Sequence, residues 1–107
     1  GVGVFSFKRL CADALGAPDY LAIARIYHTV ILVGIPIMGP DMRNEAARFI
    51  TLIDILYECR VKLFATAAAE PADLYVSGDG SFEFARTASR LMEMRSAAYM
   101  SMGHGST

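Results

Sequence analysis

The chain has 107 residues, is 54% hydrophobic and 20% charged, and carries a formal net charge of −1. This length suits one domain with a core of its own. Its longest basic run is the pair Lys8-Arg9, whereas nucleic-acid-binding domains carry a basic face or stripe. The apolar run from Val30 to Met38 is too short to span a bilayer. We therefore expect no nucleic-acid partner and no transmembrane segment.

The apolar content predicts that the chain is part of a larger assembly. A hydrophobic fraction of 54% lies somewhat above the average for soluble domains. Such a chain is expected to bury part of its surface against a further domain or a sister subunit. The sequence also begins at Gly1 without a Met, which favours a segment of a longer protein.

The cysteines and histidines predict no metal site. Cys11 and Cys59 stand alone, without metal-ligand or Cys-x-x-Cys spacing, and lie in apolar segments. We interpret them as reduced, buried structural residues. Because His28 and His104 are the only histidines, a His-rich zinc site is excluded.

Strands and helices are predicted to alternate from the start of the chain. An apolar run of β-branched and aromatic residues over 2–7 predicts a strand, and 8–11 begins a helical turn. Apolar residues three or four apart then predict a helix over 19–27. The β-branched run 29–33 predicts a strand buried on both faces, as in parallel sheets that helices cover.

The clearest element follows the turn at Gly39-Pro40-Asp41. A helix begins near Met42, with Pro tolerated in its first turn, and its apolar stripe continues to Tyr57. We expect the remaining elements in this order: a buried strand at 61–65, a helical turn at 72–75, a glycine turn at 76–81, a helix at 84–96 whose Ala88, Leu91 and Met92 face inward, and a flexible tail at 103–107.

This order predicts an α/β fold with a small parallel sheet of about three strands flanked by helices, similar to half of a P-loop or Rossmann domain. If the chain is a degenerate second copy of half a P-loop domain, the strands at 29–33 and 61–65 are neighbours in its parallel sheet. No phosphate-cradling loop accompanies them, because neither Gly-x4-Gly-Lys-Ser/Thr nor Gly-x-Gly-x-x-Gly occurs. The pair Gly78 and Gly80 comes closest, but Glu83 stands where a third glycine would be needed.

Short motifs along nearly the whole chain resemble one protein family. Among them are Phe5-Ser6-Phe7, Leu10-Cys11, Leu15-Gly16-Ala17, Asp19-Tyr20, Thr29-Val30 before Ile35-Pro36, Arg48-Phe49-Ile50, Leu52-Ile53-Asp54, Leu56-Tyr57-Glu58, Val61-Lys62-Leu63, Leu74-Tyr75, Phe82-Glu83-Phe84 and Ser89-Arg90-Leu91. They resemble the C-terminal region of the ZapE-like cell-division ATPases, P-loop proteins of AAA+ type with mitochondrial relatives. One departure is Gly34, where members often carry Asp.

The resemblance implies that Walker A and Walker B lie upstream of Gly1. ATP and Mg would then bind in the parent ATPase, whereas this fragment alone is expected to bind neither and to be inactive. Residues 1–102 would form a C-terminal α/β domain that supports ATP hydrolysis through domain or subunit contacts. The alternatives are an interaction module for cell-division or membrane-protein clients and an independent Rossmann-like enzyme.

The resemblance also implies partners and a location. The expected partners are the upstream ATPase domain of the same chain, a second copy in a homo-oligomer, and the cell-division protein FtsZ. The implied location is the bacterial cytoplasm, with the membrane periphery as an alternative, or the mitochondrion for a eukaryotic protein. Met94, Met100 and Met102 are candidates for an apolar contact with such a partner.

Two arginines are the candidate catalytic residues. Arg86 and Arg90 lie four apart, so they share one face of the last helix, where like charges are unfavourable without a compensating anion. One hypothesis is an arginine finger or sensor for a neighbouring ATP, because a guanidinium stabilises charge on a phosphoryl group. The alternative is a structural network with Glu83, Glu93 or Asp54.

Other polar residues are weaker candidates. Thr66 lies near the C-terminal end of a strand, where open α/β sheets bind ligands. Its hydroxyl is expected either to contact a nucleotide or to hydrogen-bond within the domain at the strand end. Arg48 is expected to form an intra-domain ion pair. Asp54 and Glu58 share a helix face, but no third ligand joins them, so we expect a solvated or Arg-paired face and no metal site.

Overall fold

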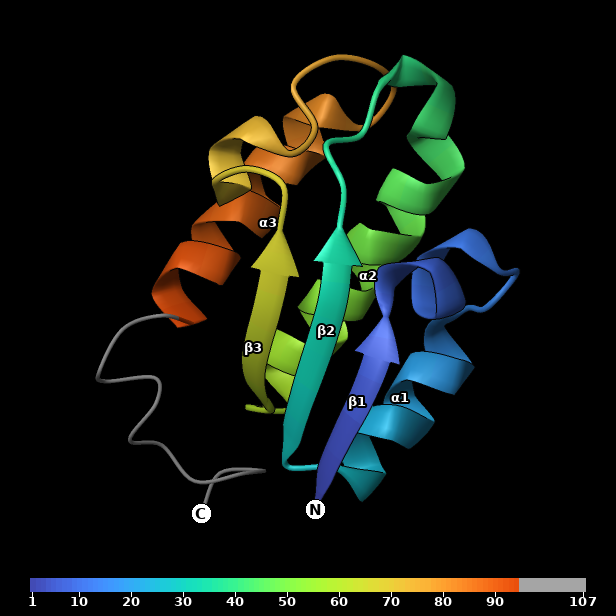
Figure 1. Ribbon diagram of the computed structural model, residues 1–107, viewed down its shortest axis with the longest axis vertical. Helices are drawn as coiled ribbons and strands as arrows, with labels where there is room; N and C mark the ends of the chain where they lie inside the picture. The colour runs from blue at the N-terminus through green and yellow to red at the C-terminus, as the bar shows by residue number, and fades with distance from the viewer. Residues whose placement is uncertain (95–107) are drawn as a thin grey trace.

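The computed structural model describes residues 1–94 as alternating strands and helices (Figure 1). The predicted tail at 103–107, the last residues of the predicted final helix, Met100 and Met102 lie outside the described residues. The elements are β1 (Val2–Ser6), a π-helical turn (Lys8–Ala12), α1 (Ala17–Ile26), β2 (Thr29–Ile35), a 3₁₀ turn (Pro40–Met42), α2 (Arg43–Glu58), β3 (Lys62–Ala67), a 3₁₀ turn (Pro71–Asp73) and α3 (Ser81–Met94).

The three strands form one parallel sheet in the order β1-β2-β3. Val4, Ile31 and Phe64 lie side by side across it, which fixes the register of all three strands. The predicted α/β class, the small parallel sheet and the pairing of the strands near 29–33 and 61–65 are confirmed. None of the helices in the described part of the chain is both long and apolar enough to cross a membrane.

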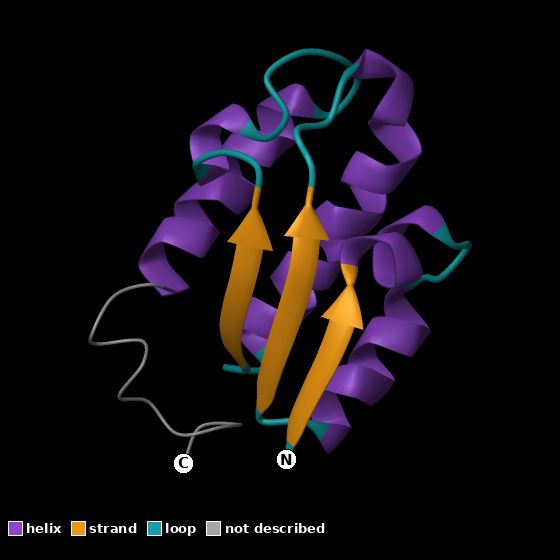
Figure 2. Cartoon of the chain, in the orientation of Figure 1, coloured by secondary structure: helices purple, strands orange, loops and turns teal. Residues whose placement is uncertain are grey.

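All the helices lie on one face of the sheet, behind the strands in Figure 2. The strand order explains this arrangement, because each new strand is added on the same side of the previous one. Right-handed connections then bring every crossover helix to the same face. The prediction that β2 is buried on both faces is therefore wrong: Val33, which points away from the helices, is 43% exposed. The strand predicted as buried at 61–65 is also largely exposed, because β3 forms an edge of the sheet.

Helix α2 forms the centre of the helical layer and packs against both α1 and α3. Its stripe of buried residues is spaced three or four apart and consists of Ala46, Phe49, Leu52, Ile53 and Leu56. The Phe49 ring lies 5.8 Å from both the Phe7 ring and the Phe84 ring, measured between centroids. Phe49 therefore connects the end of β1 with α3 through one aromatic cluster.

Helix α3 begins earlier than predicted, at Ser81, and buries a different methionine. Its inward stripe is Phe84, Thr87, Ala88, Leu91 and Met94, again at helical spacing. Met92 was predicted to face inward, but it follows Leu91 by one residue and so points about 100° away around the helix. Its side chain is exposed, and Met94 is buried instead.

The aromatic cluster predicts a large stability loss on truncation of Phe49. Phe49→Ala is expected to lower the free energy of unfolding by about 3–5 kcal/mol, because it removes a fully buried ring and leaves a cavity. Urea denaturation followed by circular dichroism measures the change. Phe82→Ala is the matched control: this ring is 88% exposed, and we expect a change within about 0.5 kcal/mol. Equal losses in the two variants would contradict the assigned core.

Candidate functional site

The candidate arginines meet the carboxylates of α2 along the seam between α2 and α3. Arg90 donates to Asp54 with 2.5 Å between Nη1 and Oδ1, and its other terminal nitrogen lies 3.8 Å from Glu58 Oε1. Arg86 approaches the second oxygen of Asp54 at 3.6 Å. Asp54 thus offsets the repulsion between the two arginines, and the Asp54–Glu58 face is Arg-paired as predicted.

Arg90 is held from a second side by an aromatic ring. Its guanidinium carbon lies 4.9 Å from the centroid of Tyr57, at cation–π distance. The Tyr57 hydroxyl donates to the carboxylate of Glu93, and this hydrogen bond raises the pKa of Tyr57. Four side chains from two helices therefore converge on one guanidinium: Asp54, Tyr57, Glu58 and, through Tyr57, Glu93.

The two arginine side chains differ in their exposure to solvent and in the number of partners that hold them. The Arg90 side chain is 22% exposed and has several partners, whereas the Arg86 side chain is 62% exposed and makes one longer ion pair. The structural network expected as the alternative to a finger is thus formed, with Asp54 as the shared acceptor. Of the two guanidinium groups, that of Arg86 is the one able to reach an outside anion without breaking a short ion pair.

Thr66 lies at the carboxyl end of β3, away from both arginines. Its hydroxyl oxygen accepts the backbone N–H of Gly34 at 2.8 Å. The register shifts here between Leu32 and Ile35, and Gly34 has a φ of +80°, a conformation that glycine adopts without a steric penalty. Thr66 therefore satisfies an amide at an irregular strand end. Within residues 1–94, no hydrogen bond or ion pair joins it to Arg86 or Arg90.

The glycine turn before α3 is packed against the chain rather than open to a phosphate. Gly78 has a φ of +114°, and a Cβ atom there would lie 2.7 Å from the Tyr75 hydroxyl and 2.9 Å from Pro40 Cα. Close packing thus explains this glycine. Asp79 and Glu83 place carboxylates at the same helix N-terminus, where they would repel a phosphate that the helix N–H groups could otherwise bind. These residues do not fit a primary ATP site.

Arg48 and Cys11 form a structural pair between α2 and the π-helical turn. Arg48 donates to the carbonyl oxygen of Cys11 at 3.1 Å, so the predicted ion pair is wrong: Arg48 has no carboxylate partner among the salt bridges of the described residues. Burial raises the pKa of the Cys11 thiol to about 12, although the positive charge of Arg48 acts in the opposite direction. Cys11 is therefore an uncharged core thiol, as its apolar context predicted.

Carboxylates and thiols do not gather into a metal site in the part of the chain that the structure describes: no group of three His, Cys, Asp or Glu side chains could hold an ion.

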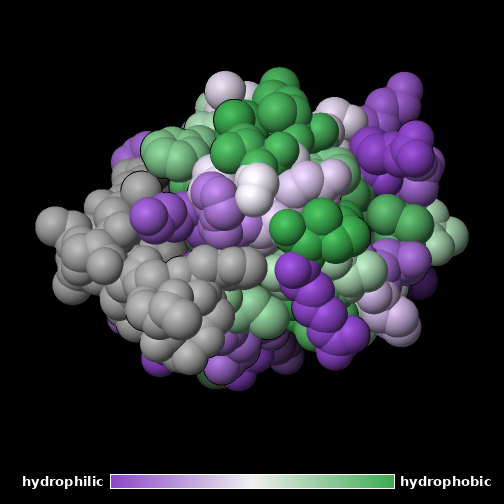
Figure 3. Space-filling view, turned by 90° about the horizontal axis from the view of Figure 1, so that it is seen from below, coloured by the Kyte–Doolittle hydropathy of each residue, from purple (hydrophilic) through white to green (hydrophobic). Residues whose placement is uncertain are grey.

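Two apolar surfaces were missed by the sequence reasoning. The first, which we call the open sheet face, is the side of the sheet without helices, and its apolar residues are Val2, Val4, Ile31, Val33 and Phe64. Apolar side chains gather along the upper edge of Figure 3, on the side where the strands lie in Figure 1. Two-residue alternation in each strand could have identified them, but only once the covered face was known.

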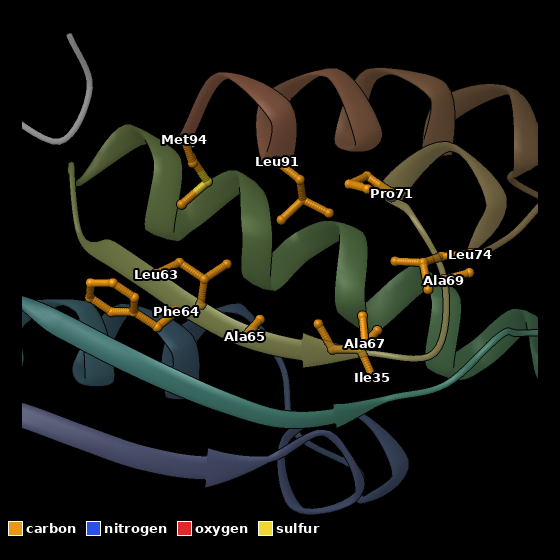
Figure 4. Close-up of a pocket in the computed structure, with 10 residues that line it drawn as sticks. All are labelled: Ile35, Leu63, Phe64, Ala65, Ala67, Ala69, Pro71, Leu74, Leu91 and Met94. Carbon is orange, nitrogen blue, oxygen red and sulfur yellow. The ribbon is translucent and has the colours of Figure 1, made fainter. Parts of the chain in front are cut away.

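The second surface is a hollow of about 230 Å³ between β3 and α3 (Figure 4). Leu63, Ala65 and Ala67 line it from the strand, and Leu91 and Met94 line it from the helix. No charged side chain lines it, so its walls offer no group for acid–base or phosphate chemistry.

The chain is similar to ATPases over almost its full length. The family model described as AFG1-like ATPase matches residues 1–102. The cell division protein ZapE of Escherichia coli K12 is 43% identical over 99 residues, which cover 92% of this chain and 26% of that protein. The zebrafish lactation elevated protein 1 homolog B is 32% identical over 130 residues, with the same shares of 92% and 26%. The chain thus spans about a quarter of the length of these relatives. No solved structure matches the chain significantly.

The shared acceptor in the arginine network predicts a measurable stability loss. Asp54→Asn keeps the shape of the side chain but removes its charge, so Arg90 loses its short ion pair. We expect the free energy of unfolding to fall by about 1–2 kcal/mol, as for hydrogen bonds to charged groups. Asp79→Asn is the control, because the exposed pair between Asp79 and Arg43 should contribute no more than about 0.5 kcal/mol. Urea titration of both variants decides, and an Asp54→Asn loss no larger than the control would contradict the assigned network.

Proposed function

This chain belongs to the AFG1-like ATPase family, and we propose that it is a non-catalytic α/β part of such an ATPase. It would support ATP hydrolysis in the whole protein through domain or subunit contacts, with ATP and Mg bound by the rest of the polypeptide. The whole protein would act in the cytoplasm of a bacterium, as a single chain or a homo-oligomer.

One observation carries the proposal of a non-catalytic role. The family match covers residues 1–102, yet the sequence has no phosphate-binding loop and its nearest glycine turn is packed against Tyr75 and Pro40. Neither feature offers a cradle for phosphates within residues 1–94. This favours a chain that positions groups against a nucleotide bound elsewhere.

Arg86 is the residue we propose for that contact. Within residues 1–94, its mostly exposed guanidinium is anchored only by the 3.6 Å approach to Asp54, so it can turn to a phosphoryl group on a neighbouring domain or subunit. Arg90 would then act as a positioning residue, because it fixes Asp54 and the α2–α3 seam. A nucleotide contact by Thr66 rests on its strand-end position; its hydroxyl already accepts the Gly34 N–H, which leaves its proton and one lone pair for a ligand.

Substitution of the two arginines in the complete polypeptide tests this assignment. Arg86→Ala should lower kcat for ATP hydrolysis by roughly 10³-fold or more while the melting temperature stays nearly unchanged, since fingers contribute on that scale. Arg90→Ala should mainly lower the melting temperature, because it removes the ion pairs that Arg90 makes with Asp54 and Glu58. Arg43→Ala, which removes another exposed arginine, is the control and should leave turnover unchanged. Unchanged turnover in Arg86→Ala would refute the finger.

A second candidate function is an interaction module, and the outer side of α3 favours it. A hollow of about 340 Å³ there is lined by Tyr75, Val76, Phe84, Ala88 and Met92, among others. Val76 and Met92 are exposed large apolar residues, as is Phe82 on the same helix. This surface lies on a different element from the open sheet face, so it could hold a client while the sheet contacts the ATPase.

Loss of binding without loss of turnover would identify the client surface. Phe82→Ser together with Met92→Ser in the complete polypeptide should weaken capture of FtsZ, the partner that the family resemblance suggests, and leave ATP turnover unchanged. Ile37→Ser, at an exposed apolar residue outside α3, is the matched control. Co-sedimentation with FtsZ measures binding. Equal binding by the unsubstituted protein, the double variant and Ile37→Ser would exclude this surface.

A further inference from the structure

The open sheet face is apolar although nothing in residues 1–94 covers it. Val4 and Phe64 are 66% and 51% exposed, and with Ile31 they form a continuous row across the three strands. The row continues toward the carboxyl ends of the strands in Val33. Contiguous apolar surface of this kind on a folded domain marks a site of contact.

The sequence of β2 shows that this face is built for burial. Val30 and Leu32 point into the helical layer and are fully buried, while Ile31 and Val33 point to the open side, so the strand is apolar on both faces. A strand with one wet face would alternate apolar and polar residues. All-parallel sheets occur almost only with both faces covered by helices. The helical layer that this composition requires is present on one side only.

We propose that the open sheet face is a docking surface for one or more amphipathic helices from another part of the same polypeptide. This inference rests on the proposed function, in which the chain acts through contact with the rest of the ATPase. The matched region makes up 26% of the relatives, so most of their length is available to supply such helices.

Charge and topology favour helices of the same polypeptide over a second copy of the face. The strand residues on this side include one ionisable group, Lys62, next to neutral Ser6, Thr29 and Thr66, and no carboxylate. Two copies packed face to face would give Lys62 no counter-charge from the same surface. An amphipathic helix can place an acidic residue beside Lys62 and an apolar stripe over Val4, Ile31 and Phe64.

Cysteine protection in the complete polypeptide tests the proposal. Val33→Cys is expected to react with a maleimide at least about tenfold more slowly than Val76→Cys, since a docked helix must open before the thiol is reached. Val76, 68% exposed in a loop, is the matched control, whereas Val33 is 43% exposed here. Val4→Cys provides a second position on the face. Mass spectrometry distinguishes label on the introduced cysteine from label on the native Cys11 and Cys59. Comparable rates at all three sites would overturn the proposal.

The same measurement separates the possible covers and is independent of catalysis. Protection that persists on dilution of a monomer, verified by size-exclusion chromatography, supports a helix of the same polypeptide. Protection that vanishes on dilution would identify a second copy and overturn the proposal, as would protection seen only after a client is added. Labelling does not require ATP turnover. If Val33→Cys is protected while Arg86→Ala leaves turnover unchanged, the docking surface stands and the proposed arginine finger fails.

Discussion

Every other feature of this molecule depends on the handedness of its crossovers. The strands follow one another across the sheet without a reversal, so right-handed connections place all the helices on one side. In folds that reverse the strand order, later helices cover the second face, and ligands bind at the point of reversal. This chain has no such reversal within its described residues. That absence leaves one face of the sheet apolar and uncovered, and it removes the usual crevice for a nucleotide.

The helical layer is held by two kinds of interaction at its two sides. On the sheet side, Phe49 joins rings from β1 and α3 in a buried cluster. On the outer side, Asp54 accepts from arginines of α3 and so ties α3 to α2. The outer network leaves Arg86 mostly exposed and holds Arg90 in place. A seam held by ion pairs that leaves one guanidinium mostly exposed is consistent with the proposed contact to a site located elsewhere.

Local patterns predicted the elements well where the pattern was long. The stripe of α2 and the β-branched run of β2 specified a helix and a strand, because periodicity of 3.6 or 2 is a local property. Two predictions failed where the result depended on the orientation or partner of a single side chain. Met92 was assigned inward although Met94 is buried, since Met92 lies four residues after Ala88 and Met94 three after Leu91, and both spacings fit one helix face. Arg48 was given a carboxylate partner although a backbone carbonyl lies in reach, which sequence spacing does not reveal.

The sequence by itself determined the α/β class, the parallel pairing, the absence of a phosphate loop and the family, since each of these is written in short motifs and periodicity. Only the tertiary structure decided which face of the sheet is covered, because strand order sets the side of every crossover and no local pattern encodes that order. It also decided that Asp54 is shared by two arginines and that Gly78 is a packing residue. Both depend on contacts between residues more than 30 positions apart, from Asp54 to Arg86 and Arg90 and from Gly78 to Pro40, which the fold brings together.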